Sequence, residues 1–99
     1  MKESINPEYK EMILRALEYH FPGARVYLFG SRATLTHKEG ADVDLAVDAG
    51  TKILPAEMLR ARVTLEHLRM PLMTDLVDMN AIVSELKEEI LKNGVVWKS

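Results

Sequence analysis

A short apolar run that ends in Gly30-Ser31, followed by Asp42-Val43-Asp44, is the feature that most restricts how this chain can fold. Four consecutive apolar residues, 26–29, predict a central strand covered on both faces. Glycine has no Cβ, so the backbone can turn sharply after this strand and a phosphate can approach it closely. The Ser31 hydroxyl either adds a contact to that phosphate or caps the short helical turn that follows. We therefore predict a buried strand that leads into a phosphate-binding turn.

The two aspartates lie at the start of a second predicted strand, which runs from about Val43 to Val47. Residues i and i+2 of a strand point to the same face, so the carboxylates of Asp42 and Asp44 are expected to converge while Val43 turns away. Adjacent carboxylates repel each other unless a cation lies between them. Hard oxygen ligands of this kind suit Mg²⁺, and the alternative is a purely acidic sheet edge. The pattern favours the magnesium site.

A third predicted strand, at residues 72–79, carries two further acids, Asp75 and Asp78. These two positions have opposite parity, so a regular strand sends them to opposite faces and only one of them can join the first two carboxylates. Asp78 also competes with Asn80 for the role of a turn or cap residue before the next helix. The residues alone leave both candidates open.

The remaining pattern predicts an α/β fold in which helices flank a small mixed sheet. An amphipathic helix of about fourteen residues begins at Asn6-Pro7 and ends near Phe21-Pro22-Gly23. A second helix begins at Leu54-Pro55 and reaches about Arg69, and a last helix ends at Asn93-Gly94. The expected order is helix, strand, α-turn or short helix, strand, helix, strand and helix. The residues after Gly94 extend to the terminus, where a tryptophan either stacks on a base or covers the core.

Length and composition limit what such a fold can do alone. Ninety-nine residues, 47% of them hydrophobic, predict a single domain over residues 1–99 with little chain for a second substrate lobe. The net charge is −2 with both signs interspersed, which disfavours long nucleic acid as a partner. The chain has no cysteine, no apolar leader and no stretch long enough to span a membrane, so we expect a soluble, cytoplasmic protein.

Gly-Ser, ten intervening residues and Asp-x-Asp together resemble the signature of the polymerase-β-like nucleotidyltransferase superfamily. The wording Gly30-Ser31-Arg32-Ala33, with Asp-Val-Asp-Leu-Ala-Val from residue 42, is similar to its minimal, stand-alone branch. The resemblance covers nearly the whole chain and implies the corresponding small α/β fold. It implies transfer of a nucleoside monophosphate, AMP from ATP, with release of pyrophosphate. Two residues depart from the usual pattern: Leu35 stands where a small residue, often glycine, is common, and Ala41 stands where serine is common before the first aspartate.

The resemblance also implies roles for the acidic residues. Asp42 and Asp44 would hold two Mg²⁺ ions, one on the triphosphate and one at the attacking hydroxyl. The family's third carboxylate sits in an apolar-Asp-apolar-apolar context, which Asp75-Leu76-Val77 matches, so Asp75 rather than Asp78 would complete the second metal site. These aspartates would form the catalytic and metal-binding set.

The turn would bind the nucleotide. Gly30 and Ser31 would contact β- and γ-phosphate oxygens and leave the α-phosphorus open to in-line attack. Arg32 would either contact the triphosphate or pair with an aspartate and hold the loop.

The resemblance finally implies a partner protein. Members of the minimal branch are commonly paired with a small, all-helical HEPN protein, in many pairs a ribonuclease-type toxin. The transferase binds this toxin and inactivates it by adding AMP to a tyrosine, which would make the present chain an antitoxin. The alternative is a catalytically weak or inactive binding module that sequesters a helical partner. A nucleic-acid-processing transferase would need more chain and more positive charge.

Overall fold

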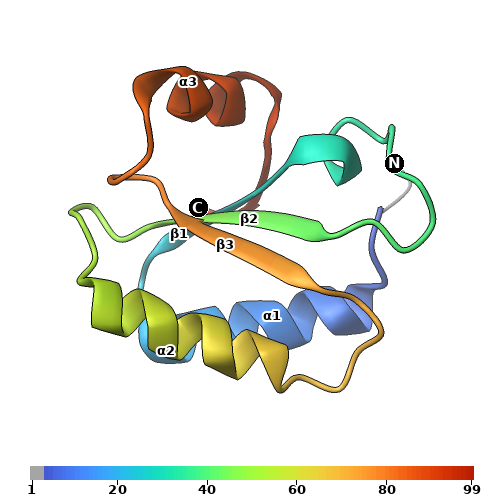
Figure 1. The fold of residues 1–99 in the computed structure, drawn as a ribbon, viewed down its shortest axis with the longest axis horizontal. Coiled ribbons are helices and arrows are strands. Elements are labelled where there is room, and N and C mark those ends of the chain that lie inside the picture. Colours follow the sequence, from blue (N-terminus) through green and yellow to red (C-terminus); the bar gives the residue numbers. More distant parts are fainter. Residues whose placement is uncertain (1–3) are drawn as a thin grey trace.

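The computed structural model describes residues 4–99, in which three helices flank a four-stranded sheet. Figure 1 shows two helices covering one face of the sheet and the third lying over the opposite face. The predicted α/β fold class is therefore confirmed. In chain order the elements are α1 (Pro7–His20), β1 (Arg25–Phe29), the 3₁₀ turn η1 (Gly30–Arg32), β2 (Val43–Asp48), α2 (Pro55–Glu66), β3 (Thr74–Asp78), α3 (Ser84–Asn93) and β4 (Val95–Lys98).

The sheet is mixed, with the strand order β3-β2-β1-β4. Strand β1 pairs antiparallel with both β2 and β4, and β2 pairs parallel with β3. Strand β1 is thus central, as its unbroken apolar run predicts. On β2, Val43, Leu45 and Val47 belong to the larger core cluster, together with residues of α1 and α2. Ala46 belongs to a smaller cluster with Ile90 of α3, so successive side chains of β2 pack on opposite faces of the sheet.

The helix boundaries follow from local capping. The Asn6 side chain accepts a hydrogen bond from the Glu8 N–H at 2.8 Å, and Pro7 occupies the first turn of α1, which has the predicted fourteen residues. Helix α2 is shorter than predicted because it ends at Glu66 rather than near Arg69. The His67 N–H bonds to the Val63 carbonyl at 3.2 Å, and the His67 ring nitrogen Nδ1 lies 2.8 Å from the same oxygen. The His67 side chain therefore lies within hydrogen-bonding distance of the Val63 carbonyl, one of the carbonyls in the last turn of the helix.

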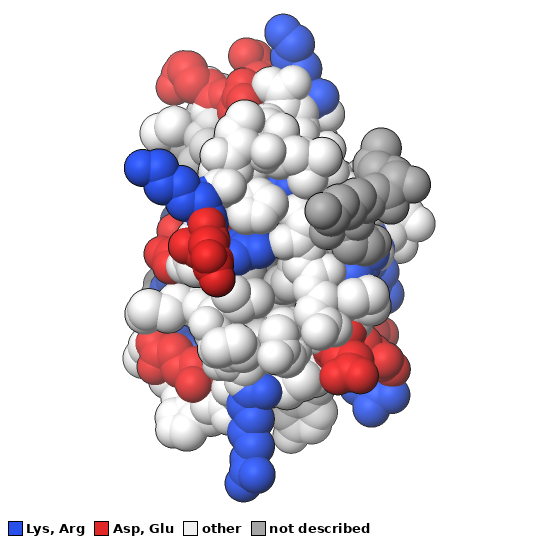
Figure 2. All heavy atoms as spheres, turned by 90° about the vertical axis from the view of Figure 1, so that its right-hand side faces the viewer, with Lys and Arg blue, Asp and Glu red and all other residues white. Residues whose placement is uncertain are grey.

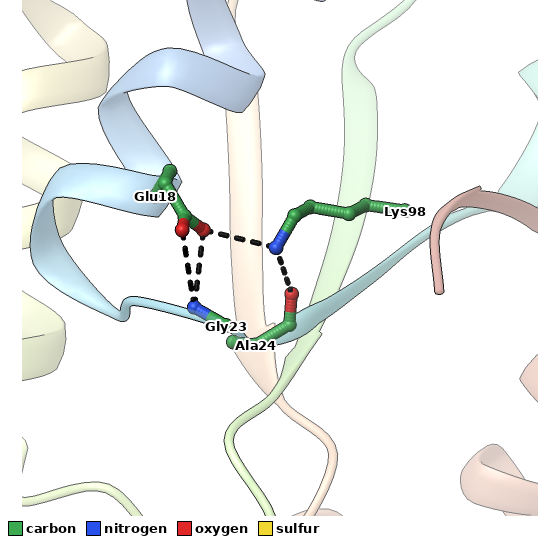
Figure 3. Close-up of polar contacts among 4 residues, drawn as sticks. All are labelled: Glu18, Gly23, Ala24 and Lys98. Atoms are coloured by element: carbon green, nitrogen blue, oxygen red, sulfur yellow. Dashed lines mark hydrogen bonds and ion pairs between the residues drawn. The ribbon is translucent and has the colours of Figure 1, made fainter.

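The C-terminal residues form an edge strand, β4, that the sequence did not predict. Trp97 is buried in the larger core cluster, which decides between its two interpretations in favour of core packing. Lys98 donates to the Glu18 carboxylate at 2.9 Å and to the Ala24 carbonyl at 3.3 Å (Figure 3). Glu18 also accepts from the Gly23 N–H, and its pKa is lowered, chiefly by the hydrogen bond from Lys98. These contacts join the end of the chain to the turn between α1 and β1.

None of the helices within residues 4–99 is both long and apolar enough to cross a membrane.

Candidate functional site

Strand pairing brings the Gly-Ser turn and the predicted carboxylates to one end of the sheet. Phe29, the last residue of β1, pairs with Asp44 on one side, and Asp75 of β3 pairs with Asp44 on the other. Residues paired directly across neighbouring strands direct their side chains to the same face. This end of the sheet, where β1 runs into η1 and where β2 and β3 begin, is on the right in Figure 1.

Gly30 lies against the carboxylate of Asp44. Its φ of +74° is in the left-handed region, which glycine adopts without steric cost. A Cβ built on Gly30 would collide with one Asp44 carboxylate oxygen and lie 3.2 Å from the Asp44 Cγ. The backbone conformation therefore favours glycine here, and a larger residue would displace the Asp44 carboxylate. The turn that is predicted to bind phosphate is thus contiguous with the central carboxylate.

The three carboxylates lie close enough to affect one another. The pKa of Asp44 is raised, first by burial and then by the negative charges of Asp75 and Asp42. Asp42 and Asp75 are exposed at the surface, whereas Asp44 is half-buried. Such a set favours a divalent cation, because the cation would relieve this repulsion and carboxylate oxygens are suitable ligands for Mg²⁺. Within residues 4–99, no group of three or more Asp, Glu, His or Cys side chains is arranged as a ready metal site.

Asp78 lies on the opposite face and has a different environment. It is buried, and its carboxylate accepts the Ile53 N–H at 2.7 Å and the Asn80 N–H at 2.9 Å. These bonds hold the turn after β3 and connect it to the segment before α2. The structure thus confirms the parity argument and the prediction that Asp78 is a turn residue. Asp75 is the acid that pairs with Asp44, and its catalytic role stays a prediction.

Arg32 is buried behind the turn. Its Nε donates to the Ala41 carbonyl at 2.9 Å and a terminal nitrogen donates to the Ser4 carbonyl at 2.6 Å. The guanidinium therefore holds the loop, but the expected aspartate partner was wrong: in the described chain its partners are carbonyl oxygens. A contact with the triphosphate stays a prediction. Ser31 is half-buried, and η1 has no side-chain cap, so the capping interpretation of its hydroxyl was wrong.

Leu35 has a φ of +59°, in the left-handed region that residues other than glycine rarely adopt. Among residues 4–99, no other non-glycine residue has a positive φ. The side chain is 55% exposed, so core packing does not compensate for the strain. The loop is closed by hydrogen bonds from the Thr36 N–H to the Ser31 carbonyl at 2.9 Å and between the Thr34 and Thr36 hydroxyls at 2.9 Å. Leu35 therefore adopts the conformation that glycine would adopt.

A cavity of about 420 Å³ lies between this turn and α3. Gly30 and Ser31 form part of its wall, and Leu86, Glu89 and Asn93 of α3 form another part. The sequence gives no sign that α3 takes part in the site, because the pattern of an amphipathic helix does not show what its exposed face lies against.

Charge on this side of the molecule is mixed. Figure 2 views the end of the sheet where β2 and β3 begin, and acidic and basic side chains alternate there with uncharged surface. The described part of this face shows no continuous basic area of the kind that binds long nucleic acid.

Comparison with known proteins identifies the family. Residues 11–99 match the family model described as polymerase beta, nucleotidyltransferase. No curated protein is similar enough to this chain to count as a match. A toxin-antitoxin crystal structure with AMP-PNP is 24% identical with a TM-score of 0.77, over 89% of this chain and 71% of that chain.

Two further solved structures have the same fold. One is the MNT antitoxin in complex with the tri-AMPylated HEPN toxin of Shewanella oneidensis, 22% identical with a TM-score of 0.72, over 91% of this chain and 69% of that chain. The other, provisionally described as a minimal nucleotidyltransferase, is 27% identical with a TM-score of 0.70, over 89% of this chain and 88% of that chain. The family match spans most of the sequence, including the Gly30-Ser31 turn and the three aspartates, and shows that this chain belongs to the polymerase beta nucleotidyltransferase family.

Proposed function

We propose that this chain is a Mg²⁺-dependent nucleotidyltransferase that transfers AMP from ATP to an acceptor on a partner protein. The observation that carries the proposal is the position of Asp44, which lies against Gly30 on one side and pairs with Asp75 on the other. A phosphate-binding turn and a set of carboxylates are thereby contiguous, as two-metal phosphoryl chemistry requires. Family membership supports the transferase activity, and the similar structure with AMP-PNP supports an adenine nucleotide.

Each site residue then has a specific task. Asp42, Asp44 and Asp75 would hold Mg²⁺, which when bound neutralises charge on the triphosphate and lowers the pKa of the attacking hydroxyl. The Gly30 backbone and the Ser31 hydroxyl would bind the β- and γ-phosphate oxygens, so that the α-phosphorus faces the acceptor and pyrophosphate leaves in line. Arg32 would act from behind the turn, since its bond to the Ala41 carbonyl fixes the residue that precedes Asp42.

The acceptor, we further propose, is a tyrosine of a small helical HEPN-type partner, which makes this chain an antitoxin. The support is a solved structure of the same fold in which an MNT antitoxin is bound to an AMPylated HEPN toxin. The mixed charge beside the site also suits a protein acceptor better than long nucleic acid. An intracellular toxin would place both proteins in the cytoplasm.

The alternative is sequestration of the partner without chemistry. Leu35 is the departure from the family pattern that favours it most. Its φ of +59° keeps the loop on the path that a glycine would take, which supports an active site rather than a lost one. Sequestration would neutralise the partner without changing its mass, whereas adenylylation adds AMP.

Calorimetry tests the nucleotide assignment. ATP should bind in the presence of Mg²⁺ or Mn²⁺ and lose most of its affinity when the divalent ion is chelated. The double variant Asp42→Asn, Asp44→Asn should lose this metal-dependent binding, because the negative charge that attracts the cation is gone. Equal, metal-independent binding by the wild type and the double variant would refute the assignment.

A further inference from the structure

The cavity between η1 and α3 adjoins the proposed triphosphate site but contains none of its three carboxylates. Its volume of about 420 Å³ is within the range of small-molecule pockets, about 300–1,000 Å³. Gly30 and Ser31, which would hold phosphate oxygens, form one end of it. A ligand held by this turn therefore has room to extend toward α3.

The α3 wall of the cavity offers hydrogen-bond acceptors. The Asn93 side-chain amide donates to one Glu89 carboxylate oxygen at 2.8 Å, which leaves the other Glu89 oxygen available to a ligand. Asn93 and Gly94 lie at the C-terminal end of the helix, where the macrodipole is negative. A carboxylate beside a negative helix end disfavours phosphate and favours uncharged donors. The charge of this wall therefore distinguishes the neutral part of a nucleotide from its triphosphate.

The remaining wall is apolar in part. Phe29 and Leu86 are both half-buried and line the cavity, Phe29 from the end of β1 and Leu86 from the first turn of α3. Apolar side chains with a few convergent polar groups are the usual lining of a nucleotide or cofactor site. Carboxylates that accept hydrogen bonds from ribose hydroxyls are a recurring feature of nucleotide recognition.

We propose that this cavity binds the nucleoside of the substrate, with Glu89 accepting hydrogen bonds from the ribose hydroxyls and with Phe29 and Leu86 against the base. This inference rests on the proposed function, because it assumes that the triphosphate lies at Gly30 and Ser31. It assigns substrate discrimination to α3 and makes the preferred substrate a ribonucleotide.

Calorimetry with three ligands in the presence of Mg²⁺ tests it: ATP, 2′,3′-dideoxy-ATP and inorganic tripolyphosphate. The wild type should bind ATP about tenfold or more tightly than dideoxy-ATP, since a hydrogen bond to a charged group is lost with the hydroxyls. Glu89→Ala should bind both nucleotides equally and bind tripolyphosphate as the wild type does. The matched control is Glu88→Ala: Glu88 is the neighbouring glutamate, likewise exposed, but it does not line the cavity, so this variant should keep the tenfold preference.

Alanine is the best helix former, so both variants should fold, and thermal unfolding verifies that they do. A wild type without preference for ATP over dideoxy-ATP, or a Glu89→Ala variant that keeps the preference, would overturn the nucleoside site. Tripolyphosphate binding would in either case still support the proposed triphosphate turn. If the wild type binds none of the three ligands, the proposed function and this inference both fail.

Discussion

Asp44 and Asp48 lie on the same face of β2 in opposite electrostatic surroundings. The pKa of Asp44 is raised by burial and by the charges of Asp75 and Asp42. The pKa of Asp48 is lowered, first by the hydrogen bond from the Asn80 side chain and then by that from the Gly50 N–H. The fold therefore disfavours the ionised form of Asp44 and favours that of Asp48.

This difference predicts opposite effects of two similar substitutions in metal-free protein. Because the folded-state pKa of Asp44 is raised, the folded state binds more protons between the unfolded and folded pKa values, and stability falls as pH rises through that window. Asp44→Asn should therefore be more stable than the wild type at neutral pH. Asp48 contributes stability above its unfolded pKa and loses it as pH falls through its folded pKa, so Asp48→Asn should be less stable. Thermal unfolding in chelator from about pH 3 to pH 8 measures both, and shifts of the same sign would contradict the pKa directions.

Leu35 gives a second prediction at the scale of one residue. A non-glycine residue in the left-handed region is strained, and this side chain is 55% exposed and has little packing to lose. Leu35→Gly should relieve the strain and be more stable than Leu35→Ala by on the order of 1 kcal/mol, because alanine loses the side chain but keeps the unfavourable φ. Urea unfolding compares the two. An alanine variant at least as stable as the glycine variant would mean that the loop is not held at positive φ in solution.

At the scale of elements, the parallel pairing of β2 with β3 decides which acid joins the site. Asp75 lies beside Asp44, and Asp78 faces away and holds a turn. Sequence parity separates the two acids, but it cannot say which strand β3 pairs with, because pairing depends on contacts distant along the chain.

Asp75→Asn and Asp78→Asn should consequently fail in different assays. Asp75 is exposed, so its substitution should leave stability nearly unchanged and reduce AMP transfer by orders of magnitude. Asp78→Asn replaces a buried acceptor of the Ile53 and Asn80 N–H groups and should cost about 1–3 kcal/mol of folding free energy. The molecules that fold should still transfer AMP. Chemical denaturation and transfer rates, measured on both variants, check this. The reverse assignment would mean that β3 is shifted by one residue.

Local pattern predicts the elements whose signals are local. The apolar run before Gly30, the alternation after Asp42 and the cap at Asn6 each place an element correctly. Strand β4 was not predicted because its short run forms a strand only by pairing with β1, far away in sequence. The carbonyl partners of Arg32 are equally non-local, since one of them is the Ser4 oxygen.

For the whole molecule, the two faces of the sheet have different tasks. The face under α1 and α2 carries the larger core cluster, and the opposite face is covered by α3. The candidate site lies where that opposite face meets the end of β1. Membership of the family supports a nucleotidyltransferase, and the acceptor proposed above is a residue of a partner protein.

Transfer of labelled phosphate tests the central claim most directly. The chain is incubated with Mg²⁺ and the proposed partner, a small helical HEPN-type protein, with ATP labelled at either the α- or the γ-phosphate. We predict that the partner acquires α label and no γ label, and that the Asp42→Asn, Asp44→Asn double variant binds the partner without labelling it. A partner that is bound and neutralised with no label from the wild type would contradict the claim in favour of sequestration. Acquisition of γ label would contradict it in favour of phosphorylation.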